Sequence, residues 1–192
     1  MIWLVLVFIG LSSAWANDCP DDICWRTLCA PVTNDTCNGA IIHKGSHCEC
    51  CDVCETDVGP CAKERSEVNV RLEADTNHML LGLTAPTCDS AGYYTGMQIR
   101  GSQAFCVTKN GTMIDGYSVY RWMTGDNMNC QCARDQYDYM QTGLIGKMFH
   151  CEANGNYASV GCTGSVCYCQ DLDGKQVGTT TVPIGEKDSL NC

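Results

Sequence analysis

The chain has 192 residues, a formal net charge of −10 at pH 7 and eighteen cysteines. An acidic surface of this size disfavours nucleic acid, heparin and anionic membranes as partners, because all three carry negative charge. Three phenylalanines, nineteen glycines and few long apolar runs argue against one large hydrophobic core. They favour small modules, each held by its own disulfides.

Residues 1–16 predict a secretory signal peptide. An apolar stretch from Ile2 to Leu11 precedes Ala14-Trp15-Ala16, a small-x-small cleavage signal that makes Asn17 the expected mature N-terminus. The stretch is shorter than the roughly 20 apolar residues that span a bilayer. All cysteines follow it, and secretion passes through an oxidising compartment, so they are expected to pair as disulfides. We therefore expect a secreted, extracellular and soluble protein, and a monomer.

Residues 17–60 predict a separate cysteine-rich module. Its eight cysteines are Cys19, Cys24, Cys29, Cys37, Cys48, Cys50, Cys51 and Cys54. Eight cysteines allow roughly 100 pairings, and the spacing selects none of them. The cluster from Cys48 to Cys54 would suggest zinc in a cytosolic protein. The signal peptide favours disulfides instead, so we expect no metal and no cofactor.

The rest of the chain is an internal duplication. With Cys88 set against Cys151, six further pairs coincide without a gap: Gly92 with Gly155, Tyr94 with Tyr157, Gly101 with Gly164, Ser102 with Ser165, Cys106 with Cys169, and Gly111 with Gly174. One skipped residue then brings Gly116 onto Gly178. Each unit ends in Asn-Cys and has a cysteine upstream, Cys61 or Cys132. The units are therefore 61–130 and 131–192.

One difference between the units predicts a disulfide. The second unit has Cys162 and Cys167 where the first has Ile99 and Ala104. The two cysteines are absent together, as a bonded pair would be, since a lone survivor would be a reactive thiol. A Cys162–Cys167 bridge would pin a four-residue loop. Each of the three segments then holds an even number of cysteines, so each can be closed by its own bridges.

The expected secondary structure is the same in both units. A helix is predicted from Ala62 to about Leu81 and from Ala133 to about Thr142, ending at Gly82 and Gly143 in left-handed caps. Short strands should follow the second cysteine of each unit.

Turns and modification sites can also be placed. Asn110-Gly111 and Asp173-Gly174 are expected to be hairpin turns, which favours a turn over a calcium loop at residues 171–174. The sequons at Asn34 and Asn110 are candidate glycosylation sites.

At these residues the chain resembles the thyroglobulin type-1 domain. The matching positions are Cys132, Cys151, Gly155, Tyr157, Cys162, Cys167-Tyr168-Cys169, Asp173-Gly174, Gly178-Thr179 and Cys192. Cys167-Tyr168-Cys169-Gln170 replaces the family's Cys-Trp-Cys-Val, and Gly161-Cys162 replaces its Gln-Cys. The first unit, with Ala104-Phe105-Cys106-Val107, is a degenerate copy.

The resemblance implies small disulfide-rich modules, each with a short helix and a small antiparallel β-sheet. It also implies bridges between neighbouring cysteines: Cys61–Cys88, Cys106–Cys130, Cys132–Cys151, Cys162–Cys167 and Cys169–Cys192. The N-terminal module is more weakly similar to cysteine-rich modules of arthropod protease inhibitors. It is also weakly similar to the Gly-Cys-Gly-Cys-Cys box of insulin-like growth factor-binding proteins, with His47 and Glu49 replacing two glycines.

Catalysis is not expected. The sequence contains no Gly-x-Ser-x-Gly, His-Glu-x-x-His or phosphate-loop motif, and its four histidines are scattered. Pairing accounts for every cysteine, which leaves no thiol nucleophile. A binding protein is the expected class.

The resemblance implies a secreted inhibitor of papain-like cysteine proteases that fills the active-site cleft with a wedge of three loops. In the second unit these loops are Met140, Gln141, Thr142, Gly143, Leu144, Ile145 and Gly146; Thr163, Gly164, Ser165 and Val166; and Thr179, Thr180, Thr181 and Val182. Loops already held by bridges lose little entropy on docking. Two alternatives stay open: a growth-factor or ligand-binding protein of insulin-like growth factor-binding type, and an extracellular matrix component.

Two expectations concern the first unit. Its corresponding first loop is residues 79–83, and both units share Met-x-x-Gly-Leu there. Met79 and Met140 fit a core position beneath a helix end as well as a contact role. The middle loop, residues 100–103, lacks the equivalent of the Cys162–Cys167 bridge, which we call the staple, and should be looser. If only one unit inhibits, we expect it to be the second.

Overall fold

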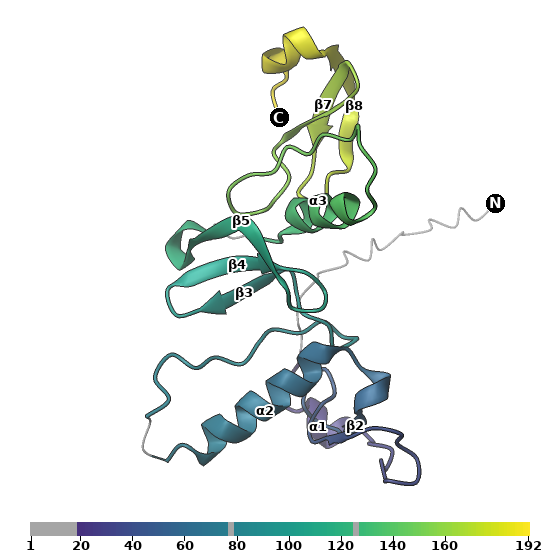
Figure 1. The fold of residues 1–192 in the computed structure, drawn as a ribbon, viewed down its shortest axis with the longest axis vertical. Helices are drawn as coiled ribbons and strands as arrows, with labels where there is room; N and C mark the ends of the chain where they lie inside the picture. The colour runs from purple at the N-terminus through teal and green to yellow at the C-terminus, as the bar shows by residue number, and fades with distance from the viewer. Residues whose placement is uncertain (1–18, 77–78, 125–126) are drawn as a thin grey trace, which may run out of the picture.

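The computed structural model describes residues 19–76, 79–124 and 127–192, so the predicted signal peptide lies outside the described residues. The chain forms three successive units: the first lies at one end of the long axis, beside the beginning of the second, and the third lies at the other end (Figure 1). We call them the N-terminal unit (residues 19–60), the first repeat (61–130) and the second repeat (131–192). None of the described helices is long and apolar enough to cross a membrane.

The N-terminal unit is held mainly by its disulfides. Its regular elements are short: α1 (Ile23–Arg26), the antiparallel pair β1 (Ile41–Ile42) and β2 (Val53–Cys54), and the 3-10 turn η1 (Glu55–Asp57). The first four cysteines pair in order with the last four, as Cys19–Cys48, Cys24–Cys50, Cys29–Cys51 and Cys37–Cys54. Two-residue strands cannot hold a fold by themselves, so the four bridges supply most of the constraint.

Five further bridges close the two repeats. They join Cys61 to Cys88, Cys106 to Cys130, Cys132 to Cys151, Cys162 to Cys167 and Cys169 to Cys192. These are the pairs that the family resemblance implies. All eighteen cysteines are bonded, and every bridge stays within its own unit.

The two repeats share one architecture. The first consists of helix α2 (Pro60–Ala74) and the antiparallel strands β3 (Met97–Arg100), β4 (Gln103–Val107) and β5 (Met113–Tyr120), followed by η2 (Arg121–Met123). The second consists of α3 (Gln131–Gln141), β6 (Val160–Thr163), β7 (Val166–Gln170) and β8 (Gln176–Pro183), followed by η3 (Ile184–Ser189). The strand orders are β3-β4-β5 and β6-β7-β8. This is the small disulfide-rich fold predicted from the sequence.

The repeats match in detail as well. The ladder shifts at the equivalent place in both, between Phe105 and Val107 and between Tyr168 and Gln170. Turns containing Asn110-Gly111 and Asp173-Gly174 connect the last two strands of each sheet, as predicted. Both sheets therefore come from one pattern of turns and bridges.

Helix α2 is shorter than the sequence predicts, ending at Ala74 rather than near Leu81. The carboxylate of Asp75 accepts hydrogen bonds from the backbone N–H groups of Met79 and Leu80, at 3.1 and 2.8 Å. A side chain that takes up backbone donors in this way competes with helix propagation. Gly82 has a φ of 86° but lies in the following loop, so it does not cap the helix.

Helix α3 ends close to its predicted limit. It stops at Gln141, and Gly143 adopts a left-handed φ of 70° while its N–H donates to the Met140 carbonyl at 3.3 Å. Glycine accommodates this conformation without a Cβ clash.

A tyrosine in each repeat is buried against the helix. The Tyr94 hydroxyl donates to Glu64, and the Tyr157 hydroxyl donates to Asp135 at 2.7 Å. Burial, followed by the hydrogen bond to a carboxylate, raises the pKa of both tyrosines well above the ordinary value. Burial also raises the pKa of Tyr117. These phenols favour the folded state only while they are protonated.

Stability should therefore fall as the pH rises above about 10, the pKa of tyrosine in an unfolded chain. Above that pH the unfolded state releases protons that the folded state retains, so alkali favours unfolding. In an absorbance titration, three of the eight tyrosines should ionise late. Replacing Tyr94 and Tyr157 by phenylalanine should remove two of these three late transitions. A single transition near the ordinary pKa would contradict this expectation.

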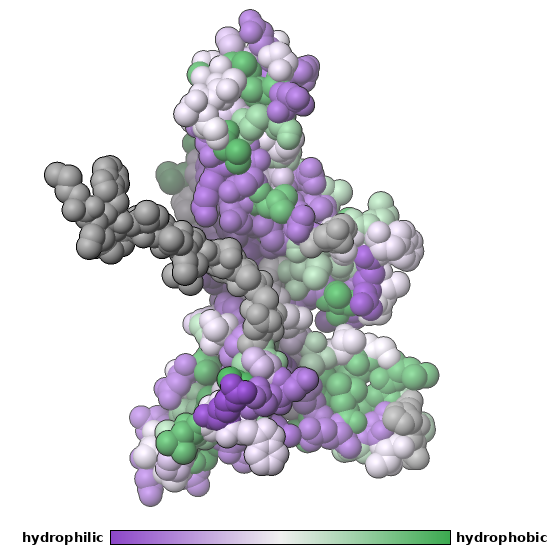
Figure 2. Space-filling view, turned by 180° about the vertical axis from the view of Figure 1, so that it is seen from behind, coloured by the Kyte–Doolittle hydropathy of each residue, from purple (hydrophilic) through white to green (hydrophobic). Residues whose placement is uncertain are grey.

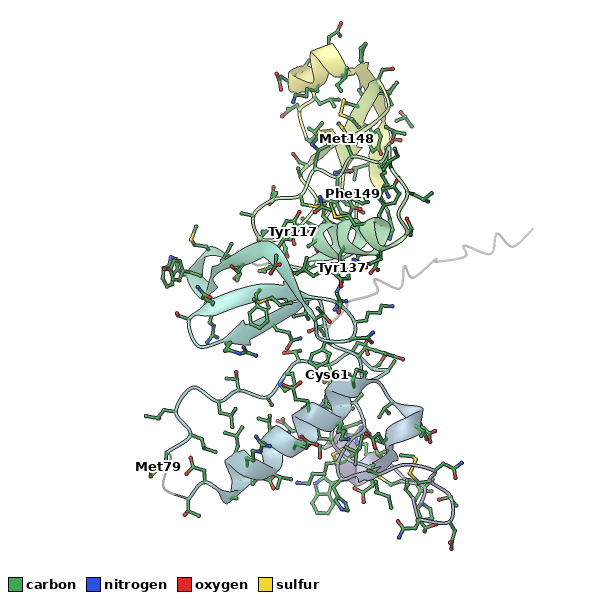
Figure 3. The ribbon with its side chains drawn as sticks, viewed as in Figure 1. Cys61, Met79, Tyr117, Tyr137, Met148 and Phe149 are labelled. Carbon is green, nitrogen blue, oxygen red and sulfur yellow. A yellow bond between two sulfur atoms is a disulfide. The ribbon has the colours of Figure 1, made fainter. Side chains whose placement is uncertain are left out.

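The two repeats share a hydrophobic core. Helix α3 of the second repeat packs on the sheet of the first, and Tyr117 and Tyr137 lie side by side at the junction (Figure 3). The buried members of this core are Ala104, Cys106, Ile114, Met128, Cys130 and Ala133. Gly155 lies so close that an added Cβ would be 2.4 Å from the Cys106 sulfur. The repeats are thus one packed body, although their bridges are separate.

Polar groups fix the same junction. The Arg134 guanidinium donates to the carbonyls of Val107 and Tyr94, at 2.6 and 2.7 Å. Burial lowers the pKa of Arg134 from its ordinary value. The buried Asn156 side chain accepts from the N–H of Asn129 at 2.8 Å and donates to the Asn127 carbonyl at 2.9 Å. Bonds that satisfy buried polar groups on both sides define one relative orientation.

The N-terminal unit is joined to helix α2 in a similar way. The buried Arg65 donates to the carbonyls of Gly45, Ser46 and His47, and its Nε lies 3.3 Å from a carboxylate oxygen of Glu49. Each repeat helix therefore packs against the unit before it.

Candidate functional site

The first predicted contact loop of the second repeat follows helix α3. Met140 and Gln141 form the last turn of α3, and residues 142–146 follow as an exposed loop. Met140 is 64% exposed, and its counterpart Met79 is 79% exposed. These exposures contradict the core interpretation of both methionines and leave them free to contact a partner.

The loop after α3 presents an apolar side chain on a fixed backbone. Ile145 is 95% exposed and precedes Gly146, whose φ is 113°. The Tyr139 hydroxyl accepts a hydrogen bond from the Lys147 N–H at 3.2 Å, and the Thr142 hydroxyl accepts one from the Leu144 N–H at 3.2 Å. Because its side chain is almost fully exposed, Ile145 adds almost nothing to the stability of the fold.

The second predicted loop is the tip of the β6–β7 hairpin. Thr163 pairs with Val166 across it, and Gly164 has a φ of 60°. The Cys162–Cys167 bridge joins the next pair of the ladder. The tip is therefore closed by a covalent bond one residue behind the turn.

The third predicted loop was placed wrongly. Residues 179–182 lie inside strand β8, where Thr181 pairs with Tyr168 and Val182 with Cys167. The segment that reaches the hairpin tip comes next: Pro183 pairs with Val166, and the Ile184 N–H donates to the Ser165 carbonyl at 2.8 Å. Proline ends the strand because it lacks a donor, and this was a usable sequence signal.

The structure thus assembles an edge from three segments, which we call the second edge: residues 144–148, 163–166 and 183–186. A hollow of about 510 Å³ joins the first two segments, with Gly146, Met148, Thr163 and Gly164 in its lining. Met148 and Phe149 lie beside the sheet in Figure 3. The exposed apolar side chains of the edge are Leu144, Ile145, Met148, Val166 and Ile184.

The first repeat has an equivalent edge, which we call the first edge: residues 79–83, 100–103 and 120–123. Gln103 pairs with Tyr120, and the Arg121 N–H donates to the Ser102 carbonyl at 2.9 Å, as Ile184 does to Ser165. The hairpin pairs residue for residue like that of the second repeat, although the staple is absent. Our expectation of a looser middle loop is not reflected in this pairing.

The apolar pair Ile99 and Ala104 takes the place of the missing staple. These residues pair directly across β3 and β4, as Cys162 and Cys167 do across β6 and β7. Ala104 is fully buried, and Ile99 packs against the same core. Burial of apolar surface therefore closes the first hairpin where a bond closes the second.

This substitution leads to a test. Replacing Cys162 by isoleucine and Cys167 by alanine gives the second repeat the residues of the first. The hairpin should still form, with a loss of about 2 kcal/mol in the free energy of unfolding, because the bridge closes only a short loop. Denaturant unfolding measures the loss. The reciprocal variant, Ile99→Cys with Ala104→Cys, should form a bridge detectable by non-reducing peptide mapping. Complete unfolding of the second repeat by the first variant would contradict this account.

The groups that could carry nucleophilic or metal chemistry are engaged in other interactions. Every cysteine is in a disulfide, so no thiol can act as a nucleophile or as a thiolate ligand. His47 lies close to the sulfurs of Cys19 and Cys48, but their bond removes those ligands from any metal site. Asp171 accepts from the N–H groups of Asp173 and Lys175, which makes residues 171–175 a turn.

Comparison with known proteins finds that part of this chain is similar to a known family. The sequence pattern of the thyroglobulin type-1 repeat matches residues 61–132. Thyroglobulin from Rattus norvegicus is 28% identical over 105 residues, which cover 53% of this chain and 4% of that protein. Thyroglobulin from Bos taurus is 27% identical over 112 residues, covering 54% of this chain and 4% of that protein. The chain therefore corresponds to a small part of these relatives.

The match falls on the first repeat, the copy that lacks the staple. Thyroglobulin type-1 domains are inhibitory or binding modules and not catalytic ones, and the family is known for protease inhibition. Extensive disulfide bonding of this kind is typical of extracellular proteins.

Proposed function

We propose, on the premise that this chain contains a thyroglobulin type-1 repeat, that it is a secreted inhibitor of papain-like cysteine proteases. Its second edge would enter the active-site cleft and exclude substrate. The observation that carries this proposal is Ile145, an almost fully exposed apolar side chain on a loop that bonds on both sides hold in place. Interfaces gain most of their affinity from a few such anchors.

The physical advantage of this edge is its rigidity. The loop after α3 lies within the Cys132–Cys151 bridge, and the hairpin tip lies within Cys162–Cys167. Segments held in one conformation lose little entropy on docking, and a backbone that resists bending is a poor substrate for the protease it blocks.

The distribution of charge also supports a contact role. Although the whole chain carries −10, the three segments of the second edge contain one acidic residue, Glu186, and one basic residue, Lys147. The segments of the edge are therefore neutral by formal charge, in contrast to the whole chain. A carboxylate buried in a cleft without a partner would cost binding energy.

The remaining expectations follow from secretion. Cleavage after Ala16 and glycans on Asn34 and Asn110 belong to this proposal, and both asparagines are exposed. Peptide mapping of protein made in eukaryotic cells, before and after enzymatic removal of glycans, tests both points.

Titration of the oxidised protein against cathepsin L-like and cathepsin B-like proteases tests the function. Tight, competitive inhibition that rises with inhibitor concentration until the protease is saturated is the expected result. Intact protein that inhibits neither enzyme would refute the proposal and favour the ligand-binding alternative. Binding of an insulin-like growth factor, measured in parallel, would then discriminate between that alternative and a matrix role.

A further inference from the structure

The first edge carries side chains that the second edge lacks. Arg100 pairs with Gln103 and Gln103 with Tyr120, so the three side chains lie in a row on one face of the sheet. Phe105, two residues from Gln103, shares that face. The Arg100 guanidinium lies 5.6 Å from the centre of the Phe105 ring.

An aromatic stack extends this row. The rings of Tyr120 and Trp122 lie 4.4 Å apart, with planes inclined by 7°. Trp122 is 74% exposed, and Met123 beside it is also exposed. We call the set Arg100, Phe105, Tyr120, Arg121 and Trp122 the aromatic platform.

The fold itself does not require the platform. At the equivalent positions the second repeat has Thr163 for Arg100, Pro183 for Tyr120 and Gly185 for Trp122, and it builds the same three-stranded sheet. Large exposed aromatic side chains that fold formation does not need mark an interaction site. Tryptophan, tyrosine and arginine are also the residue types that dominate binding hot spots.

A hollow borders the platform. It measures about 430 Å³ and lies between the segment around Leu81 and Pro86 and the side chains of Ile99, Arg100 and Phe105. Met79, Leu80 and Leu81 are exposed on the same loop. Figure 2 shows a hydrophobic patch there, beside the grey atoms at the lower right. Figure 3 places Met79 at the outer end of the loop that follows α2. The hollow is large enough for one or two side chains of a partner.

The charge of the first edge identifies the partner's chemistry. Its three segments, residues 79–83, 100–103 and 120–123, contain two formal charges, Arg100 and Arg121, within a chain of net charge −10. Neither arginine forms an ion pair with a carboxylate of the described residues. The Glu64 carboxylate, which lines the hollow, accepts a hydrogen bond from the Tyr94 hydroxyl. Two arginines with free donors next to stacked aromatic rings suit carboxylates next to apolar side chains.

We propose that the aromatic platform and its hollow bind an acidic, apolar peptide segment of a partner protein. An apolar side chain of that segment would fill the hollow or cover Trp122, and its carboxylates would meet Arg100 and Arg121. This site is separate from the second edge and does not depend on protease inhibition.

The experiment uses the full-length oxidised protein and calorimetric titration with the synthetic peptide acetyl-Glu-Asp-Leu-Phe-Asp-Glu-amide. Two matched peptides carry lysine at the acidic positions or alanine at the apolar positions. The acidic apolar peptide should bind, more weakly at high salt, and both matched peptides should bind at least tenfold more weakly. Nuclear magnetic resonance shifts should fall on residues 79–86, 100–105 and 120–123.

The variants Arg100→Thr and Trp122→Gly carry the residues of the second repeat, so the sheet should tolerate them. Each should weaken binding of the acidic peptide at least tenfold. The matched control is Trp25→Gly, which removes an even more exposed tryptophan (93% against 74%) from the N-terminal unit and should leave binding unchanged. Absence of binding at millimolar peptide, equal binding of the lysine peptide, or unchanged binding by Trp122→Gly would each overturn the proposal.

Discussion

Replacing Ile145 by arginine is expected to weaken inhibition of a papain-like protease by at least about 100-fold, because the apolar anchor of the second edge is lost. A hot-spot side chain contributes about 2 kcal/mol or more, and an arginine forced into an apolar subsite adds a desolvation cost. Each 1.4 kcal/mol or so is a factor of about ten in affinity. The inhibition constant measures the effect directly.

The fold should be unaffected by this change. Ile145 is 95% exposed, so its side chain makes almost no contact that arginine would break. The matched control is Val177→Arg, which adds the same charge to an exposed position in strand β8, away from the hairpin tip. It should alter inhibition by less than about threefold. An unchanged inhibition constant for Ile145→Arg would move the contact surface elsewhere.

A second substitution, Gly143→Arg, tests the same loop. No atom lies within 4 Å of the position where its Cβ would be built, so the new side chain has room. The left-handed backbone makes any side chain there cost about 1 kcal/mol of stability. Inhibition should fall sharply while the protein stays folded, with unfolding measured alongside to separate the two effects.

Removing the Cys106–Cys130 bridge, with alanine at both positions, is expected to unfold the first repeat and loosen the second. Its loop of about two dozen residues is worth roughly 3 kcal/mol of unfolded-chain entropy. Both sulfurs also lie in the core that α3 shares with the sheet of the first repeat. The loss should therefore exceed the entropic part alone.

Hydrogen exchange measured unit by unit is the suitable assay. In the Cys106→Ala and Cys130→Ala variant, amides of α3 should lose protection together with those of β3–β5. The control removes Cys169–Cys192, a bridge of nearly equal sequence separation (23 against 24 residues) that is absent from that core. It should affect β6–β8 and leave β3–β5 protected. Retention of full protection in α3 after loss of Cys106–Cys130 would show that the repeats are energetically independent.

The core shared by the two repeats also fixes the orientation of the first edge relative to the second. The first and second edges lie on different repeats, and Met79 and Met148 are widely separated along the molecule in Figure 3. If both proposals hold, one molecule could engage a protease and an acidic peptide at the same time. The orientation then follows from Arg134, Asn156 and the shared core, since the two repeats are in direct contact.

Much of this protein could be read from the spacing of its residues. The duplication, the two hairpin turns, the helix end at Gly143 and the paired absence of Cys162 and Cys167 are local patterns. A turn or cap is decided by a few consecutive residues, so such features survive in a single sequence. The bridges between neighbouring cysteines of the two repeats were implied by the family resemblance, which itself rests on the spacing of these cysteines.

The tertiary structure decided what depends on distant segments. The pairing of the N-terminal cysteines requires Cα atoms about 5–5.5 Å apart in space, which no spacing reveals. The early end of α2 depends on where Asp75 finds its donors. The third segment of the second edge depends on which residue of β8 lies opposite the hairpin tip. The packing of α3 on the preceding sheet and the gathering of Arg100 with Trp122 have the same origin. Apart from the Asp75 bonds, which reach only four and five residues along the chain, these are contacts between residues far apart in the sequence. Such contacts are set by packing and not by local propensity.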